Sequence, residues 1–400
     1  MDVGGREVGV TNPGKVVFPE LGLTKADLID YYVAVADGAL RGVLDRPMVL
    51  KRYVKGIAAE AFFQKRAPEK RPDWIPVARL EYARGSHADE AVATEPASLV
   101  WAINLGCVDL NPHPVRSGDL DHPDELRIDL DPVPGVEWSQ IVAVAQVVRG
   151  VLADHGLVGW PKTSGSRGIH IYSRISTDWT YPQLRLAAQT VAREVELRAP
   201  ELATSRWWKQ ERQGVFVDFN QNAKDRTVAS AYSVRAVPDA RVSTPLDWSE
   251  VAGCRPEQLT LTTVRDRFAR DGDPWAGMDA AAGSLAALLG RAEELGPPEK
   301  APTFPLIEIA RARTREEAMA GFESWRARHA EVAALLQPAD VLVDGMRGRS
   351  SLWYRIRVNL QHVPEAQRPE QAALEVDYDP WQGWRPPGGG GAATDQQEDE

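Results

Sequence analysis

This 400-residue sequence has few cysteines, no long hydrophobic run and no recognisable leader. Its two cysteines, Cys107 and Cys254, cannot build a disulfide framework or a four-cysteine zinc site, so we expect both to be reduced and packed. No uninterrupted apolar run approaches the roughly 20 residues that a membrane-spanning helix needs. The N-terminal segment lacks the basic-then-apolar layout of a signal peptide. These absences predict a soluble, non-secreted, cytoplasmic protein with no membrane partner.

The sequence also lacks an excess of basic residues. It has 57 Asp and Glu and 47 Lys and Arg, which give a net charge of −10. This balance argues against a nucleic-acid partner, since phosphate binding usually leaves a basic surface. The charge is unevenly distributed, however. Residues 41–71 hold nine Lys and Arg against three Asp and Glu, whereas 395–400 (DQQEDE) carry four acids and no base. The mean charge is therefore a poor guide to the partner.

The order of predicted elements indicates how the chain is organised. Its length predicts roughly two or three domains, and alternating strands and helices predict an α/β or α+β core on a mixed sheet. After a Pro-rich connector (LGPPEKAPTFP) we expect helix over 307–336 and a strand over 353–363. The C-terminal end has no apolar residues to bury and should be disordered. We predict a main domain over 1–295, a helical and strand extension over 296–383 and a disordered acidic tail over 384–400.

The strongest local signal is the segment 125–132 (ELRIDLDP), which alternates like a strand. Period two places Asp129 and Asp131 on the same face, about 6.5–7 Å apart along the strand. Two like charges so close need a shared cation, a basic neighbour or a shared proton. A hard divalent metal ion meets this need and suits phosphate chemistry. A solvated edge strand would show the same pattern, so this motif alone does not decide.

The segment 164–170 (SGSRGIH) reads as a glycine turn between two strands. Its glycines allow a tight turn whose N–H groups can point at an anion. Serine hydroxyls and the guanidinium of Arg167 add donors, and His170 stands on the following strand. The segment has the character of a phosphate cradle without the Walker sequence, although a plain hairpin turn would also use these glycines.

A third motif, 215–222 (VFVDFNQN), carries one acid, Asp218, on an apolar strand. Burying a carboxylate is costly unless it is paired or bound to a metal, and a buried salt bridge is the simpler alternative. The combination is more informative than any single motif. Three carboxylates and a phosphate cradle, in this order, are what two-metal nucleotidyl transfer requires.

The order DLDP (129–132), SGSRGIH (164–170) and VDFNQN (217–222) resembles the three motifs of the archaeo-eukaryotic primase superfamily. Within it, the sequence is similar to the polymerase domains of bacterial end-joining ligases, called ligase D. It most closely resembles the stand-alone actinobacterial primase-polymerase C, mainly through residues 107–140. The resemblance covers about residues 9–295. It implies an α+β fold with a catalytic core of two sheets flanked by helices, one half RRM-like, and a small C-terminal extension.

The resemblance also implies roles for site residues. Asp129, Asp131 and Asp218 would be catalytic and would hold two divalent metal ions, Mn²⁺ or Mg²⁺. The family usually has Lys where this chain has Arg167, which keeps the charge but changes the phosphate geometry. Arg212 is similar to a further basic position, in a loop that is one residue shorter here. The implied nucleotide-binding residues are Ser164, Gly165, Arg167, His170, Gln221, Arg235, Lys51 and Arg52.

Four N-terminal residues match DNA-binding positions of the family. Lys15 and Lys25 match lysines that grip the 5′-phosphate of the downstream strand at a gap. Phe62 and Phe63 match aromatic residues that stack on template bases. The alternatives are ordinary surface lysines and core packing of one phenylalanine, because adjacent residues rarely both face outward.

The resemblance implies a template-directed nucleotidyltransferase, a DNA-dependent DNA/RNA polymerase and primase that fills short gaps in excision repair or end joining and favours ribonucleotides. Its expected partners are gapped or primer–template DNA with a 5′-phosphate, NTPs or dNTPs, a separate ATP-dependent DNA ligase and Ku. We expect a monomer in the bacterial cytoplasm, at the nucleoid. Two alternatives stay open. One is a catalytically weak scaffold that binds DNA gaps or ends, and the other is a metal-dependent phosphohydrolase that needs no template.

Overall fold

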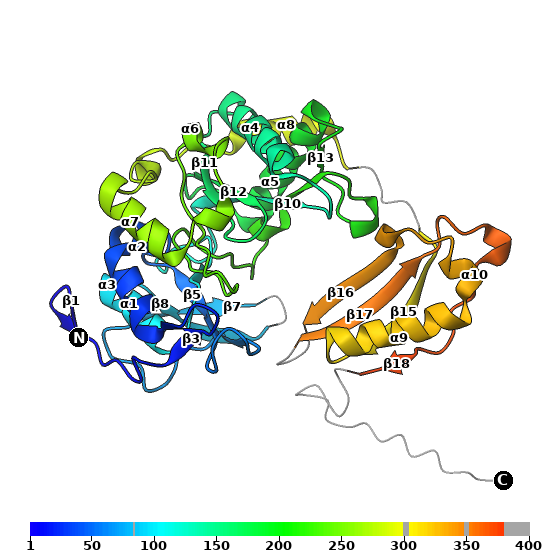
Figure 1. Ribbon diagram of the computed structural model, residues 1–400. Coiled ribbons are helices and arrows are strands. Elements are labelled where there is room, and N and C mark those ends of the chain that lie inside the picture. Colours follow the sequence, from blue (N-terminus) through cyan, green and yellow to red (C-terminus); the bar gives the residue numbers. More distant parts are fainter. Residues whose placement is uncertain (83–84, 299–303, 348–351, 380–400) are drawn as a thin grey trace, which may run out of the picture. The chain divides into compact units, whose positions relative to one another are not determined.

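The computed structural model describes residues 1–82, 85–298, 304–347 and 352–379 (Figure 1). Its contacts divide the chain into two compact units, Met1–Trp207 with Glu211–Glu299 and Trp208–Gln210 with Lys300–Glu400. The predicted acidic tail over 384–400 lies outside the described residues. Each unit has a sheet and a hydrophobic core of its own, and each is described separately below.

The N-terminal half of the larger unit is built on an antiparallel sheet in the order β6-β5-β8-β7, with β9 also paired to β5. Thr24 caps helix α1 (Lys25–Ala34) by accepting the N–H of Asp27. The strands of the sheet are β5 (Pro47–Arg52), β6 (Phe62–Gln64), β7 (Val77–Glu81), β8 (His87–Val92) and β9 (Asn111–Pro112). The other elements of this half are β1 (Asp2–Val3), β2 (Arg6–Glu7), β3 (Val16–Phe18), β4 (Leu23–Thr24), α1 (Lys25–Ala34), α2 (Ala36–Arg41) and α3 (Pro96–Asn104).

The second half of this unit is built on a five-stranded sheet in the order β11-β12-β10-β14-β13. Strand β10 is antiparallel to both neighbours, and β13 is parallel to β14. Its elements are β10 (Glu125–Pro132), β11 (Trp160–Thr163), β12 (Ile169–Arg174), β13 (Ala203–Thr204), β14 (Val215–Asp218), α4 (Trp138–Asp154), α5 (Tyr181–Arg198), α6 (Trp248–Val251), α7 (Leu261–Asp271), α8 (Ala286–Leu295), η2 (Asn220–Asn222), η3 (Pro256–Gln258) and η4 (Met278–Ala280). The short helix η1 (Lys209–Glu211) follows β13 in the chain, and its first two residues are assigned to the other compact unit.

Helices α4 and α5 pack on one face of this second sheet (Figure 1). Leu126, Ile128 and Leu130 of β10 are fully buried in the core that these helices share. The alternation predicted for this strand is therefore confirmed. It leaves the opposite face, with Asp129 and Asp131, free for polar chemistry.

A buried ionic network joins the two halves of the larger unit. Arg46, which is 0% exposed, lies 2.6 Å from Asp124 and 3.6 Å from Glu125 at the start of β10. Glu125 also pairs with Arg127 at 2.7 Å and with Arg174 of β12 at 3.1 Å. The segment before β5 is thus tied to the two central strands of the second sheet.

The smaller unit is a four-stranded sheet in the order β16-β17-β15-β18, packed against helix α9. The helix prediction over 307–336 was wrong at its start, because residues 307–312 belong to strand β15. This segment pairs with β17 on both sides of an irregularity between Glu308 and Ala310, and the pairing makes it a strand. The elements are β15 (Leu306–Ala312), α9 (Arg315–Arg328), α10 (Ala330–Ala333), η5 (Pro338–Asp340), β16 (Val341–Arg347), β17 (Leu352–Asn359), η6 (Glu365–Gln367) and β18 (Val376–Asp377).

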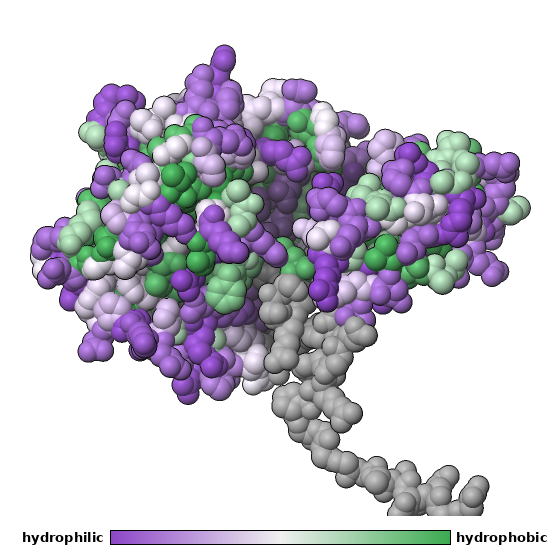
Figure 2. Space-filling model, turned by 60° about the horizontal axis from the view of Figure 1, so that its bottom comes forward, coloured by the Kyte–Doolittle hydropathy of each residue, from purple (hydrophilic) through white to green (hydrophobic). Residues whose placement is uncertain are grey.

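The surface and the cysteines agree with the sequence. Figure 2 shows a face on which hydrophilic side chains surround separate hydrophobic patches. Among the described helices, none has the length and apolar character needed to cross a membrane. Cys107 is buried and Cys254 half-buried, and both are free thiols. The larger unit contains two five-stranded sheets with flanking helices, besides the short pairs β1-β2 and β3-β4, so the α+β class is confirmed.

Candidate active site

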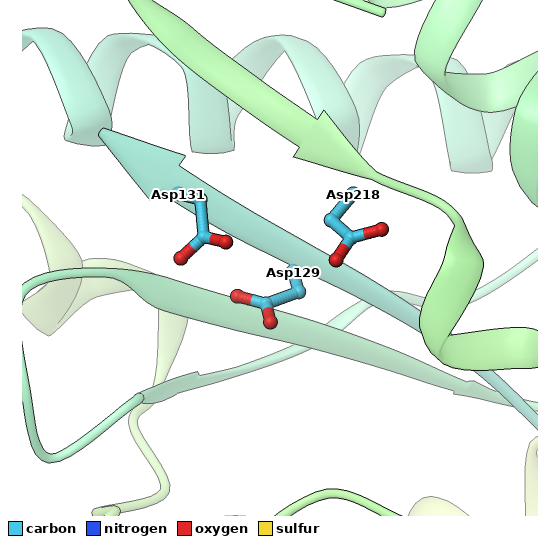
Figure 3. A group of neighbouring side chains, drawn as sticks. All are labelled: Asp129, Asp131 and Asp218. Atoms are coloured by element: carbon cyan, nitrogen blue, oxygen red, sulfur yellow. The ribbon is translucent and has the colours of Figure 1, made fainter. Parts of the chain in front are cut away.

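Three carboxylates converge on the polar face of the second sheet (Figure 3). Asp129 and Asp131 project from β10, Asp218 ends β14, and one oxygen from each lies within 4.8 Å of the others. The antiparallel register pairs Asp129 with Asp218 and Asp131 with Phe216. Alternate residues of both strands therefore face the same side. Strand pairing brings together acids that lie far apart in the sequence.

Burial makes ionisation unfavourable for two of these acids, Asp129 and Asp218. The side chain of Asp129 is 14% exposed, and Asp218 is buried. Burial raises the pKa of Asp129 to about 6, although Lys162 and Arg235 act in the opposite direction. Burial and the charge of Asp129 raise the pKa of Asp218 to about 6 as well. Three carboxylates whose oxygens converge, two of them with raised pKa values, suit a divalent metal ion with oxygen ligands, so the residues fit such an ion.

A row of polar side chains continues from the acids across the sheet. The register pairs Asp129 with His170 of β12, and His170 with Lys162 of β11. His170 Nε2 lies 3.2 Å from Asp129 Oδ1, and Lys162 Nζ lies 2.8 Å from His170 Nδ1. Sequence reasoning placed His170 here but missed Lys162. Lys162 lies on the strand that leads into the SGSRG turn, and its position opposite His170 in a hairpin was the signal that could have found it.

The SGSRG loop, residues 164–168, makes the turn between β11 and β12. The hydroxyl of Ser164 accepts the N–H groups of Ser166 at 3.1 Å and Gly168 at 3.0 Å. Gly165 has a φ of 67°, in the left-handed region that favours glycine. A Cβ at Gly168 would lie 2.2 Å from the carbonyl oxygen of Leu130. The two glycines therefore allow the loop to pass directly beside β10.

Arg167 is exposed on this loop and forms no ion pair or hydrogen bond with any described residue. It lines a cavity of about 530 Å³ together with Ser166, Trp138 and Arg241. Arg241 donates to the carbonyl of Ser166 at 2.9 Å and so supports the loop from behind. The guanidinium of Arg167 is available to an anion at the edge of the loop.

Arg235 and Lys51 meet around a buried acid that the sequence did not identify, Asp109. Arg235 donates to the carbonyl of Ser164 at 2.6 Å, and its Nε lies 3.9 Å from Asp109 Oδ2. Lys51 Nζ lies 3.3 Å from the same oxygen. Strand β5 of the first sheet thus contributes a cation beside the SGSRG loop of the second.

The remaining predicted residues of this group differ in their contacts. Gln221 donates to Asp218 Oδ2 at 2.9 Å and so orients that carboxylate. The guanidinium of Arg212 lies 3.4 Å from the centre of the Phe216 ring. Arg52 instead donates to the carbonyl of Leu105 and to the side chain of Gln64, both at 2.7 Å. Its contacts hold the first sheet together and do not reach the three acids.

Lys15 and Lys25 lie close together in the N-terminal half. Lys25 is buried and donates to the carbonyls of Thr11 at 2.6 Å and Asn104 at 3.0 Å. Lys15 is half-buried and donates to the carbonyl of Val54. Burial, and then the charge of Lys15, lower the pKa of Lys25. Two neighbouring ammonium groups are an arrangement that an anion would stabilise.

Phe62 and Phe63 are both exposed on the edge strand β6, by 53% and 42%. The alternative that one of them packs into the core was wrong. Strand β6 is short, and it pairs only with β5 among the described strands, so neither ring has a core to enter. The Lys51 ammonium lies 5.8 Å from the centre of the Phe63 ring. The aromatic pair therefore borders the same cations as the SGSRG loop.

Three comparisons with known proteins agree with this geometry. A family model described as "LigD, primase-polymerase domain" matches residues 24–275. The multifunctional non-homologous end joining DNA repair protein LigD of Mycobacterium tuberculosis (strain H37Rv) is 34% identical over 284 residues, which are 69% of this chain and 37% of that protein. The bifunctional non-homologous end joining protein LigD of Bacillus subtilis (strain 168) is 31% identical over 268 residues, 66% of this chain and 43% of that protein. The chain thus spans less than half the length of these relatives.

A solved structure, the polymerase domain of Mycobacterium tuberculosis ligase D in complex with DNA, matches with a TM-score of 0.65 and 34% identity. The match covers 69% of this chain and 99% of that one. The segment matched by the family model contains the three acids, the SGSRG loop and His170. The resemblance to ligase D inferred from three short motifs is confirmed. The chain belongs to the LigD primase-polymerase domain family and is a nucleotidyltransferase of the polymerase class.

Proposed function

We propose that the protein is a template-directed polymerase that fills short gaps in DNA during strand repair, by adding nucleotides to a primer 3′-hydroxyl. The observation that carries the proposal is the convergence of Asp129, Asp131 and Asp218, with oxygens within 4.8 Å, beside the SGSRG loop. These acids would hold two divalent ions, Mn²⁺ or Mg²⁺. Bound there, such ions lower the cost of deprotonating the hydroxyl and neutralise charge on the triphosphate.

The nucleotide triphosphate would lie between the acids and the SGSRG loop. Among the described residues Arg167 has no ion-pair partner, and Arg235 and Lys51 share the acid Asp109, so cationic groups remain for phosphates. His170 presents Nε2 on the same face. Loop N–H groups and the Ser164 hydroxyl would complete the cradle.

The DNA substrate would contact the N-terminal half. The exposed rings of Phe62 and Phe63 support stacking on template bases at a gap. The paired ammonium groups of Lys15 and Lys25 support binding of a downstream 5′-phosphate. That the matched ligase D domain is described in complex with DNA supports the same class of partner.

The family suggests the repair pathway and the protein partners that we propose for this chain. The names of the relatives refer to non-homologous end joining, and we extend this to a chain that works with Ku and a separate ATP-dependent DNA ligase. We propose that it favours ribonucleotides, primes synthesis and acts as a monomer in the bacterial cytoplasm. Residues 1–295 would form the catalytic domain and 296–383 an extension. The closer relation to primase-polymerase C stays a prediction.

Primer extension on a short-gapped duplex with a 5′-phosphate tests the function. Wild type and an Asp129→Ala/Asp131→Ala variant receive Mn²⁺ with either NTPs or dNTPs. Templated addition by wild type alone supports the proposal, and the ratio of NTP to dNTP use gives the sugar preference. Tight gap binding without addition would indicate a scaffold. Nucleotide hydrolysis that ignores the template would indicate a phosphohydrolase.

A further inference from the structure

Asp109 is a buried acid to which the proposed function gives no role. It is 2% exposed and lies just before β9, and its Oδ2 is 3.3 Å from Lys51 Nζ and 3.9 Å from Arg235 Nε. Both cations are proposed to bind phosphates of the nucleotide. An acid at this position weakens their attraction for an anion, because an opposite charge is already close to them. Its presence beside two phosphate-binding groups therefore needs an explanation.

The two carboxylate oxygens of Asp109 have different partners. The side chain of Asn111 donates to Oδ1 at 3.1 Å, whereas Oδ2 faces the two cations. Val108 and Leu110, on either side in the chain, are buried, and the N–H of Leu110 donates to the hydroxyl of Ser233 at 3.1 Å. Packing and hydrogen bonds therefore hold both the backbone and the carboxylate of Asp109 in place before any ligand binds.

The two cations come from different halves of the larger unit. Lys51 belongs to β5 of the first half, and Arg235 lies between η2 and α6 in the second. Arg235 also donates to the carbonyl of Ser164 at 2.6 Å, and a Cβ at Gly165 would collide with its Cγ, so it packs directly against the SGSRG loop. Burial acts to lower the pKa of Lys51, but the charge of Asp109 raises it above the ordinary value. The acid thus keeps Lys51 charged and close to the arginine that the loop holds.

We propose that Asp109 is a positioning residue that holds Lys51 and Arg235 at a fixed distance from each other, so that both cations face the triphosphate beside the SGSRG loop. Asp109 itself would not touch the nucleotide. Like charges repel, and without the acid the long, flexible side chain of Lys51 would turn toward solvent. The nucleotide would then have to order that side chain on binding, which costs affinity. That the ligand is a triphosphate rests on the proposed function, whereas the anchoring of the two cations does not.

Asp109→Asn separates positioning from simple electrostatics, because the two predict effects of opposite sign. If the acid only reduced the local positive charge, its removal would tighten the binding of an anion. If it positions the cations, its removal should weaken that binding. The amide has a single oxygen, which can accept from Asn111 or from the cations but cannot face both. We expect the affinity for ATP to fall by roughly tenfold, the scale of one hydrogen bond to a charged group.

Calorimetry with ATP, and with AMP as a ligand that has one phosphate, measures binding to the full chain with Mn²⁺ and without DNA. The loss in Asp109→Asn should be larger for ATP than for AMP. In primer extension, KM should rise about tenfold while kcat stays within about threefold of wild type. An affinity for ATP that is unchanged or higher would overturn the proposal, as would equal losses for ATP and AMP. Asp178→Asn removes the same charge from an exposed acid and should stay within about twofold of wild type.

A Lys51→Met background shows whether Asp109 acts through this cation. Asp109→Asn should lose less affinity there than in wild type, and an equal loss in both would overturn the proposal. Asn111→Ala keeps the charge of Asp109 but frees its Oδ1, so it should also weaken ATP binding. If Asp109→Asn does not fold, Asn111→Ala decides, and unchanged binding overturns the proposal.

The same measurements separate this proposal from the proposed function. Wild type that binds ATP but extends no primer would end the proposed function, and the binding constants of the variants would still decide the role of Asp109. Wild type that binds no ATP would overturn both.

Discussion

Asp129 and Asp218 lie directly opposite each other on antiparallel strands, and the pKa of each carboxyl group is raised to about 6. Burial is the main cause for both. Keeping both carboxyl groups ionised therefore costs free energy in the metal-free protein near neutral pH. A cation that balances their charge would remove this cost.

A pH dependence of stability follows for the metal-free protein. Because both pKa values lie above the 3.8 of an ordinary Asp, the folded state binds more protons than the unfolded chain between about pH 4 and pH 6. The free energy of unfolding should fall as pH rises through this window. Asp129→Asn should restore on the order of 1–3 kcal/mol at about pH 7.5 and little at about pH 4. Thermal melting in EDTA measures this, and a gain that is equal at both pH values would contradict it.

Loss of the two proposed metal ligands on β10 should abolish catalysis without abolishing DNA binding. A direct ligand should matter more than its supporting neighbours, whose loss costs about 10- to 100-fold, so Asp129→Ala/Asp131→Ala should reduce templated addition by more than about 100-fold. Mn²⁺ should raise the melting temperature of wild type but not of this variant. Asp266→Asn, at an exposed acid on α7, is the control and should behave as wild type. Near-normal extension by the double variant would disprove the site.

Charge reversal at Lys15 should weaken recognition of a 5′-phosphate. Lys15 is the better site for this test because Lys25 is buried, and its replacement would cost stability. Lys15→Glu should lower the preference for phosphorylated over unphosphorylated gaps by roughly fivefold, the scale of a solvent-exposed ion pair. Lys70→Glu, at an exposed lysine, gives the same net charge change as a control. Equal losses of preference in both variants would indicate a general effect of charge.

The exposed aromatic pair should contribute to gap binding by stacking. Phe62→Ala and Phe63→Ala should each lower affinity for gapped DNA by about 1–3 kcal/mol, the range for one base on one ring. Leu197→Ala removes a comparably exposed apolar side chain from α5 and should change affinity little. Fluorescence anisotropy with a labelled gapped duplex gives the three dissociation constants. If neither phenylalanine exceeds the leucine control, the template contact lies elsewhere.

The close approach of the SGSRG loop to β10 makes Gly168 sensitive to a single methyl group. In Gly168→Ala the new Cβ would lie 2.2 Å from the carbonyl oxygen of Leu130, so the loop must move away from the acids. We expect a lower melting temperature and a KM for nucleotide raised by roughly tenfold or more. Gly118→Ala, where nothing lies within 4 Å of the added Cβ, should leave both unchanged. An unchanged KM in Gly168→Ala would show that the loop position is not critical.

Local patterns predicted the parts of the site that lie on one segment. The alternation of ELRIDLDP gave the polar face of β10, and glycine spacing gave the turn that carries Arg167. Lys162 and Asp109 were missed because their roles arise from partners on other strands, His170 and Arg235. Strand pairing likewise decided residues 307–312, where local sequence suited a helix as well. Non-local pairing is the information that a single sequence shows least directly.

The buried network around Arg46 has a consequence for how this enzyme could be recombined with its relatives. Arg46 comes from the first half, whereas Asp124 and Glu125 belong to the second. A chimera that exchanged only one half for a version without the matching charge would bury an unpaired ion, at a cost of about 3–5 kcal/mol. That cost is a large share of the roughly 5–15 kcal/mol by which an ordinary domain is stable. The two halves must therefore be inherited, transplanted or redesigned together.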